Sequence, residues 1–183
     1  MSLGHTGLTP EEQHIWRMYL DVSRLIVEHV DRRLQQDARI RPVHYALLAR
    51  LAEAPHRQLR MAELAERAGV SPSRLSHAMV RLEYCGWVRR ETCTSDRRGQ
   101  LAVLTEEGHT VVTRTEPLHS EAVRQALFGW LSSEQRQALG EITESLARGL
   151  RRVGRELVGT SADLAGRTGP DHERGALTRA DGT

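Results

Sequence analysis

Residues 61–104 read MAELAERAGVSPSRLSHAMVRLEYCGWVRRETCTSDRRGQLAVL. Apolar residues recur there at helical spacing until Gly69, a residue that adopts the left-handed conformation of a sharp turn without strain. Ser71 then suits an N-cap, and Pro72 suits the first helical position, where its missing N–H is no loss. The pattern predicts two short helices joined at Gly69, the second of them capped at its end by Gly86.

The second of these helices is predicted to have two different faces. Its apolar face is made of Leu75, Ala78, Met79 and Leu82. On the other face, small hydroxyls allow close approach to the floor of a major groove, and Arg74 is long enough to bond guanine O6 and N7. We therefore predict DNA contacts from Ser71, Ser73, Arg74, Ser76, His77 and Arg81.

A hairpin is expected directly after the second helix. Residues 87–92 and 101–104 are typical of strands, and a polar segment separates them. Within that segment, Asp96 is placed to orient an arginine, and we predict that Arg97 and Arg98 enter a minor groove, whose negative potential attracts guanidinium groups. The alternative is a solvated turn with a local ion pair. Two helices followed by such a hairpin predict a winged helix-turn-helix, which binds duplex DNA.

The motifs and their order resemble the MarR (multiple-antibiotic-resistance regulator) family over about residues 10–158. Asp96, Arg98 and Gly99 match the family's Asp-x-Arg-[Gly/Ala] wing signature. Leu104, Thr105 and Gly108 match its Leu-Thr-x-x-Gly junction. The resemblance implies a mainly α fold, in which a winged helix-turn-helix with a small β-hairpin wing is flanked by N- and C-terminal dimerisation helices. It also implies a homodimeric, sequence-specific transcriptional regulator, most often a repressor, that a small aromatic or anionic ligand releases from DNA.

Start signals predict the flanking helices. Thr9, Pro10 and Glu12 form a capping-box pattern, from which an apolar stripe continues to about Gln36. Pro42 begins a second helix, and Pro55 ends it.

Two further helices are predicted to start in the second half of the chain. Thr105 precedes a helix that runs toward Phe128, and Pro117 is expected to kink or interrupt it, giving two segments. The capping pattern recurs at Ser132 and Gln135, and apolar residues then follow in steps of three and four to Leu157. This last stripe favours pairing with a second copy, although packing within the same chain is the alternative.

These elements together predict how the chain is organised into regions. We expect an N-terminal arm (1–8), an N-terminal dimerisation helix (9–40), the winged helix-turn-helix (41–104), C-terminal dimerisation helices (105–158) and a disordered tail (159–183).

A two-fold dimer would place its two DNA-binding halves on a pseudo-palindromic operator, with half-sites about 34 Å apart. A ligand that favours a dimer with the wrong spacing would then release the DNA. We name Trp16, Tyr19, His44 and Tyr45 as candidate ligand contacts because they are aromatic or imidazole groups on helices that would flank such a cleft. The alternative for all four is ordinary core or interface packing.

Composition limits the other function classes. With 183 residues and 39% apolar content, the chain is expected to form one principal globular domain, and its net charge of +2 favours no partner. Neither a membrane span nor a secretory signal is present, so we expect a cytoplasmic protein. The only two cysteines, Cys85 and Cys93, lie at opposite ends of a predicted strand, about 20 Å apart, too far for a disulfide within the hairpin.

Enzyme, cofactor and metal motifs are missing from the sequence. The nine histidines include no pair at i, i+4, and no Cys-x-x-Cys, P-loop or nucleophile elbow is present. We therefore predict no enzyme activity, no cofactor and no metal. The competing hypothesis is a winged-helix module that binds another protein and not DNA. The four arginines of the predicted DNA face count against it: Arg74, Arg81, Arg97 and Arg98.

Overall fold

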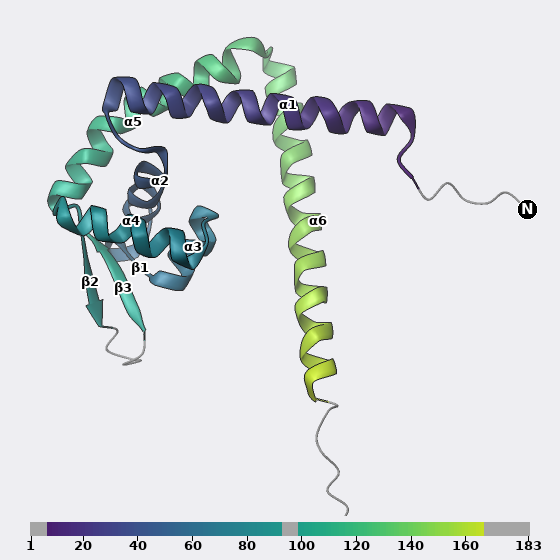
Figure 1. The fold of residues 1–183 in the computed structure, drawn as a ribbon. Coiled ribbons are helices and arrows are strands. Elements are labelled where there is room, and N and C mark those ends of the chain that lie inside the picture. Colours follow the sequence, from purple (N-terminus) through teal and green to yellow (C-terminus); the bar gives the residue numbers. More distant parts are fainter. Residues whose placement is uncertain (1–6, 93–98, 167–183) are drawn as a thin grey trace, which may run out of the picture. The chain divides into compact units, whose positions relative to one another are not determined.

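The computed structural model describes residues 7–92 and 99–166 of the chain (Figure 1), and in 153–166 it describes the backbone alone. The chain divides into two compact units, residues 1–130 and residues 131–183. Each unit is described separately below.

The first unit begins with helix α1 (Pro10–Arg33), which starts where its sequence signal predicts. The Thr9 N–H donates to the Glu12 carboxylate at 2.7 Å, and the Glu12 N–H donates to the Thr9 hydroxyl at 3.2 Å. This capping box satisfies two N–H groups that a helix start leaves without partners. A π-helical turn (Leu34–Ala38) follows, and Arg39 then reverses the chain in the left-handed conformation with φ 54°.

Helix α2 (Pro42–Ala52) is the most buried helix segment of the unit, and Leu47, Leu48 and Leu51 on it are fully buried. A short 3-10 turn (Pro55–Arg57) ends it, as Pro55 predicts. Strand β1 (Gln58–Arg60) follows, and no sequence pattern predicted it. Its three residues are too few to show an alternating pattern, so only pairing with a distant strand defines β1.

Helices α3 (Met61–Ala68) and α4 (Pro72–Tyr84) form the predicted helix-turn-helix. Gly69 between them has φ 63°, the left-handed conformation expected at this corner. The Ser71 hydroxyl accepts from the Arg74 N–H at 3.3 Å and so caps α4, while Pro72 occupies the first turn. The glycine, the cap and the proline are each where the sequence predicts them.

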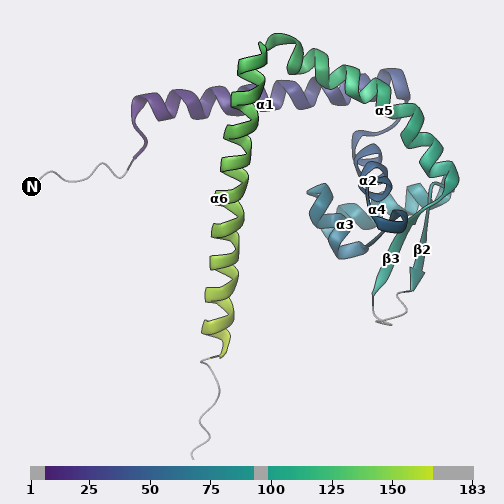
Figure 2. The same cartoon turned by 180° about the vertical axis from the view of Figure 1, so that it is seen from behind.

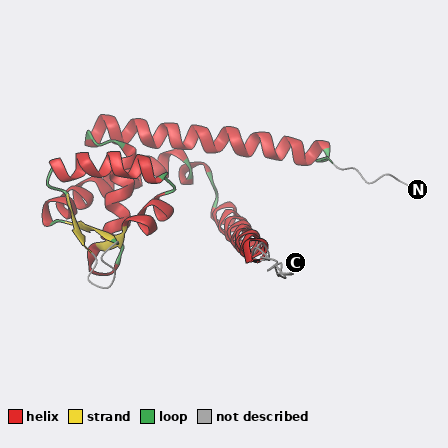
Figure 3. Cartoon of the chain, turned by 60° about the horizontal axis from the view of Figure 1, so that its bottom comes forward, coloured by secondary structure: helices red, strands yellow, loops and turns green. Residues whose placement is uncertain are grey.

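Strands β2 (Val88–Thr92) and β3 (Gln100–Leu104) form the predicted hairpin. They pair antiparallel from Val88 opposite Leu104 to Thr92 opposite Gln100. Strand β1 pairs antiparallel with the other edge of β3, so the order of the sheet is β1-β3-β2. Figure 3, with strands in yellow, shows the sheet at the edge of the helices of this unit. One hydrophobic core joins the sheet to α2, α3 and α4 through Leu47, Leu51, Leu59, Leu64, Leu75, Met79, Leu82 and Ala102.

Helix α5 (Glu106–Ala126) is one continuous helix, so the expectation of two segments is wrong. Pro117 removes one N–H donor, which bends a helix but leaves every other turn intact. Thr115 and Ala122, on either side of the proline, are buried, and α5 packs against α1 and α2. This packing holds both halves in register, and Figures 1 and 2 show α5 bending as it runs beside α1.

The second unit contains helix α6 (Ser133–Gly166). The predicted capping box is present, because the Gln135 N–H donates to the Ser132 hydroxyl at 3.3 Å and the Ser132 N–H donates to the Gln135 side chain at 2.9 Å. The helix continues through residues 159–166, where we expected a disordered tail. Residues 159–166 contain no proline. The helix therefore extends beyond Leu157, where the apolar pattern ends and where we had expected the helix to end soon afterwards. Residues 1–6 of the expected arm and 167–183 of the expected tail lie outside the described residues.

Candidate nucleic-acid interface

Helix α4 has the two faces that its sequence predicts. Leu75, Ala78, Met79 and Leu82 are buried in the core. The six residues predicted to contact DNA all lie exposed at the helix start or on its outer face: Ser71, Ser73, Arg74, Ser76, His77 and Arg81. The structure therefore brings these side chains together on one surface, while their contact with DNA stays a prediction.

The first turn of α4 suits a phosphate or a base edge. Pro72 has no N–H, and the N–H groups of Arg74 and Leu75 are bonded to Ser71, so the Ser73 N–H and the helix dipole supply the partial positive charge at this end. The Ser76 hydroxyl donates to the Pro72 carbonyl at 2.9 Å, so its oxygen is left as an acceptor for a DNA amino group. The Arg74 guanidinium makes no ion pair with any other described residue, and both edges of its fork are available.

Two further residues extend this face beyond the sequence prediction. Val80 is 63% exposed and Tyr84 is 81% exposed. The Arg81 guanidinium carbon lies 5.2 Å from the centre of the Tyr84 ring, a cation–π contact that limits where Arg81 reaches. Val80 and Tyr84 follow His77 and Arg81 at helical spacing of three or four residues, which places them on the same exposed face. The sequence analysis did not include them because they are apolar and aromatic, and we expected a polar face.

The tip of the wing lies outside the described residues. Asp96, Arg97 and Arg98, which we predicted to act at the minor groove, are among the residues without a described position, as is Cys93. The strands that carry the tip are described up to Thr92 and from Gly99. The roles of these three residues therefore stay predictions. Cys85 at the end of α4 is a partly buried free thiol.

An ion pair joins the wing to α4. The Arg90 guanidinium on β2 lies 3.0 Å from the Glu83 carboxylate on α4, and both side chains are partly buried. A charged hydrogen bond of this kind holds its two elements in one orientation. The pair therefore positions the strands of the wing against the outer helix. It was not predicted, because nothing local in the sequence relates Glu83 to Arg90.

A hollow of about 400 Å³ lies between the start of α3, helix α4 and the wing strands. Ser76 is the one predicted DNA contact among the described residues of its wall. Its other lining residues are Arg60, Met61, Ala62, Arg90, Gly99 and Gln100. Arg60 and Arg90 place guanidinium groups in this hollow beside the outer face of α4, and that of Arg90 is paired with Glu83.

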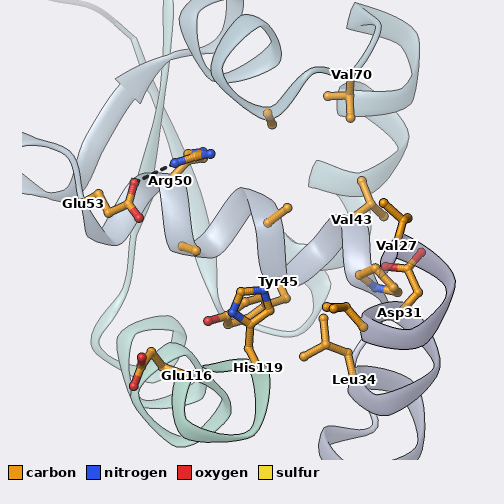
Figure 4. Close-up of a pocket in the computed structure, with 15 residues that line it drawn as sticks. Val27, Asp31, Leu34, Val43, Tyr45, Arg50, Glu53, Val70, Glu116 and His119 are labelled. Atoms are coloured by element: carbon orange, nitrogen blue, oxygen red, sulfur yellow. Dashed lines mark hydrogen bonds and ion pairs between the residues drawn. The ribbon is translucent and has the colours of Figure 1, made fainter. Parts of the chain in front are cut away.

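A larger cavity, of about 720 Å³, lies on the other side of α2 (Figure 4). It is lined by the second half of α1, by Leu34, by α2, by Glu53, by Ala68 and Val70 around the helix-turn-helix corner, and by Glu116 and His119 of α5. Pockets of this size hold drug-sized ligands.

Only Tyr45 among the four predicted ligand contacts lines this cavity. Trp16 and Tyr19 lie exposed near the start of α1, where their rings stack with centroids 6.0 Å apart. His44 is buried on a different face of α2, because adjacent helical residues point about 100° apart. The structure thus does not bring the four residues together at one site.

Two titratable groups beside the cavity have shifted pKa values. Burial raises the pKa of the Tyr45 phenol, and the Glu116 and Glu53 carboxylates act in the same direction. Burial lowers the pKa of the His119 imidazole, which Glu116 partly opposes. The rings of Tyr45 and His119 pack with centroids 4.9 Å apart. On the far face of α2, burial and then the charges of Arg41 and Arg81 lower the pKa of His44.

Two kinds of feature are missing from the described part of the chain. No cluster of three or more His, Cys, Asp or Glu side chains in residues 7–92 and 99–166 is arranged to hold a metal ion. None of the helices that the structure describes is both long and apolar enough to cross a bilayer.

Helices α3 and α4, the turn at Gly69 and the hairpin that follows define a winged helix-turn-helix protein. A model of the MarR family matches residues 40–99, which include this whole motif up to the wing. The chain belongs to the MarR family of transcriptional regulators, as the resemblance of its wing and junction motifs implied. Members of this family are DNA-binding transcription regulators and not enzymes.

Solved structures agree with this assignment. Sco3205, a MarR family transcriptional regulator from Streptomyces coelicolor solved in complex with DNA, is 53% identical, with a TM-score of 0.74 over 81% of this chain and 93% of that one. AbsC, a MarR family regulator from the same organism, is 37% identical, with a TM-score of 0.72 over 79% and 97%. BpsR from Bordetella bronchiseptica shares the fold at 18% identity, with a TM-score of 0.61 over 72% and 98%.

Proposed function

We propose that this MarR family regulator is a homodimeric repressor that inserts α4 into the major groove of a pseudo-palindromic operator. The observation that carries the proposal is the division of α4 into a buried apolar face and an exposed polar face that begins at a capped helix start. An outer helix with these properties is what the major groove admits. The solved complex of Sco3205 with DNA supports the same role here at 53% identity.

A random-duplex selection with the full chain tests this function. We expect enrichment of two inverted half-sites whose centres lie about one helical turn, or about 10 base pairs, apart. Placing the selected site over a promoter is then expected to lower transcription when the protein is present. Absence of enrichment, together with absence of DNA binding at low ionic strength, would favour the protein-interaction module instead.

Exposed apolar side chains on two helices support the dimer. Helix α1 exposes Ile15, Trp16, Met18, Tyr19, Leu20, Val22, Leu25 and Val27, and α6 exposes Ile142, Leu146 and Leu150. Large apolar side chains exposed in such number on each of the two helices are uncommon in monomers, and a second copy of the chain would bury them. We assign residues 9–40 and 105–158 to this dimer interface, which leaves residues 41–104 to bind DNA.

Replacing Leu146 with glutamate is expected to weaken the dimer by tenfold or more. Leu146 lies in the centre of the exposed apolar stripe of α6, and burial of a leucine contributes about 1.5–3 kcal/mol that a carboxylate forfeits in each subunit. Sedimentation velocity over a range of protein concentrations measures the change. Ser145→Glu is the matched control, since Ser145 is exposed one position away from the stripe. Equal dissociation of both variants would remove α6 from the interface.

Arg98→Glu is expected to weaken binding to every duplex and to flatten the salt dependence. Each lost phosphate contact changes the slope of log K against log salt concentration by about 0.9. Titrations of one selected and one scrambled duplex between low and moderate salt provide that slope. The control is Arg114→Glu on the exposed surface of α5, which alters net charge equally. If both variants change the slope alike, net charge and not the wing is responsible.

The 720 Å³ cavity is the place where we propose that a small molecule acts on DNA binding. Val70 in its wall directly precedes Ser71, the residue that caps α4. A ligand that fits only one position of this corner shifts the population between dimers that match the operator and dimers that do not. DNA binding by BpsR, which has the same fold, is regulated by 6-hydroxynicotinic acid.

A further inference from the structure

Four exposed side chains of α4 point most directly away from the protein core. Each residue of a helix is turned by about 100° from the one before it, so the directions of the side chains around α4 can be counted from its buried face. Four residues lie within about 30° of the direction opposite to that face, and we call them the outer ridge: Ser73, His77, Val80 and Tyr84. In the proposed complex, the outer ridge faces the floor of the major groove.

Val80 is the residue of the outer ridge that has no hydrogen-bonding group. Its side chain is 63% exposed, so it is not part of the hydrophobic core. Against the polar edge of a base, a valine would take hydrogen-bonding atoms out of water without replacing their bonds. The apolar group that the major groove offers is the C5 methyl of thymine. Among the four bases, thymine therefore fits Val80 best.

The place of Val80 along α4 keeps it close to the base that we assign to Arg74. Six residues separate the two, which is about 9 Å along a helix that rises 1.5 Å per residue. Successive base pairs are about 3.4 Å apart, so a helix that lies along the groove passes two or three base pairs over this length. A thymine under Val80 is therefore expected within about three base pairs of the guanine under Arg74.

Tyr84, the other ridge residue with a large apolar surface, is less suited to a methyl group. The Arg81 guanidinium carbon lies 5.2 Å from the centre of its ring, so a positive charge accompanies the ring. A guanidinium group and a phenol hydroxyl both donate hydrogen bonds, and phosphate oxygens accept them. This leaves Val80 as the apolar contact of the outer ridge.

We infer that Val80 recognises a thymine in each half-site of the operator through contact with its C5 methyl group. The inference rests on the proposed operator binding and adds an apolar specificity-determining residue to the polar contacts predicted for α4. It predicts that the selected operator contains a T·A pair within about three base pairs of the G·C pair whose preference depends on Arg74.

Replacing single thymines of the selected operator with deoxyuridine tests the inference. Deoxyuridine pairs with adenine as thymine does, but it lacks the C5 methyl group. Fluorescence anisotropy titrations with the full-length protein measure the affinity for each duplex. One position in each half-site is expected to bind about fourfold more weakly, the effect of one buried carbon group at about 0.8 kcal/mol. Equal affinity for thymine and deoxyuridine at every position overturns the inference.

Val80→Ala shows whether the methyl contact belongs to this residue. The variant is expected to keep its fold, because Val80 is exposed, and to bind the thymine and deoxyuridine operators equally. His77→Ala is the matched control, since His77 is exposed on the same ridge. It is expected to weaken binding but to keep the fourfold difference between the two operators. If His77→Ala abolishes that difference and Val80→Ala keeps it, the thymine is read by His77 and the inference is wrong.

The outcome of the selection separates this inference from the proposed function. An enriched operator in which no deoxyuridine changes the affinity leaves operator binding standing and contradicts the role of Val80. Absence of any enriched operator contradicts the proposed function, and the inference fails with it.

Discussion

Replacing Arg74 with alanine is expected to cost about 1–3 kcal/mol, or about 5- to 150-fold, in preference for one base pair of the selected operator. Arg74 is exposed in the second half of the first turn of α4, where a helix in the major groove reaches base edges. A bidentate contact to guanine O6 and N7 distinguishes that base from the other three. Binding to random duplexes is expected to fall much less, because phosphate contacts elsewhere on the surface carry it.

The measurement is a repeated random-duplex selection with the variant, followed by titration of single-substitution operators. One position of each half-site is expected to lose its preference, and the others are expected to keep theirs. Arg24→Ala on α1 is the control, because Arg24 is an exposed arginine in an i, i+4 pair with Glu28, far in sequence from α4. If affinity fell equally for every operator variant and no base preference changed, Arg74 would be a phosphate contact and not a base contact.

Replacing Gly108 with alanine is expected to destabilise the fold by about 3 kcal/mol, at the upper end of the usual cost of overpacking. A Cβ atom at this position would lie 2.0 Å from the Trp87 carbonyl oxygen and 2.8 Å from Leu104 Cδ1. The backbone cannot move aside cheaply, because the same carbonyl accepts the Thr105 N–H at 3.1 Å. The first turn of α5 packs against the Trp87 backbone, which leads into β2. This close approach explains why the Leu-Thr-x-x-Gly junction has a glycine at position 108.

Urea denaturation at one fixed protein concentration measures the loss of free energy of unfolding. Gly140→Ala is the matched control, because Gly140 lies within helix α6 and its Cβ would meet no described atom within 4 Å beyond its chain neighbours and the adjacent helix backbone. That variant is expected to gain up to about 1 kcal/mol from helix propensity. A stable Gly108→Ala protein would show that β2 and α5 can separate without loss of the core.

Short stretches of sequence were enough to predict the helix-turn-helix and the helix starts. The corner at Gly69, the Ser71 cap and the boxes at Thr9 and Ser132 each depend on groups within four residues of one another. Hydrogen bonds and steric contacts between near neighbours decide such features, so no knowledge of distant residues is needed. The periodicity of α4 likewise separated its buried face from its exposed face.

What lies against each of those faces depends on the packing of the whole fold. Strand β1 exists because β3 offers it an edge, and α5 stays continuous through Pro117 because packing on both sides holds it. The cavity unites Asp31, Tyr45 and His119 from three helices. Periodicity shows that a residue turns inward but not which distant residue it meets, so three of the four predicted ligand contacts lie elsewhere. Contacts between residues far apart in the chain form only when complete helices pack together, and close packing makes each such contact depend on all the others.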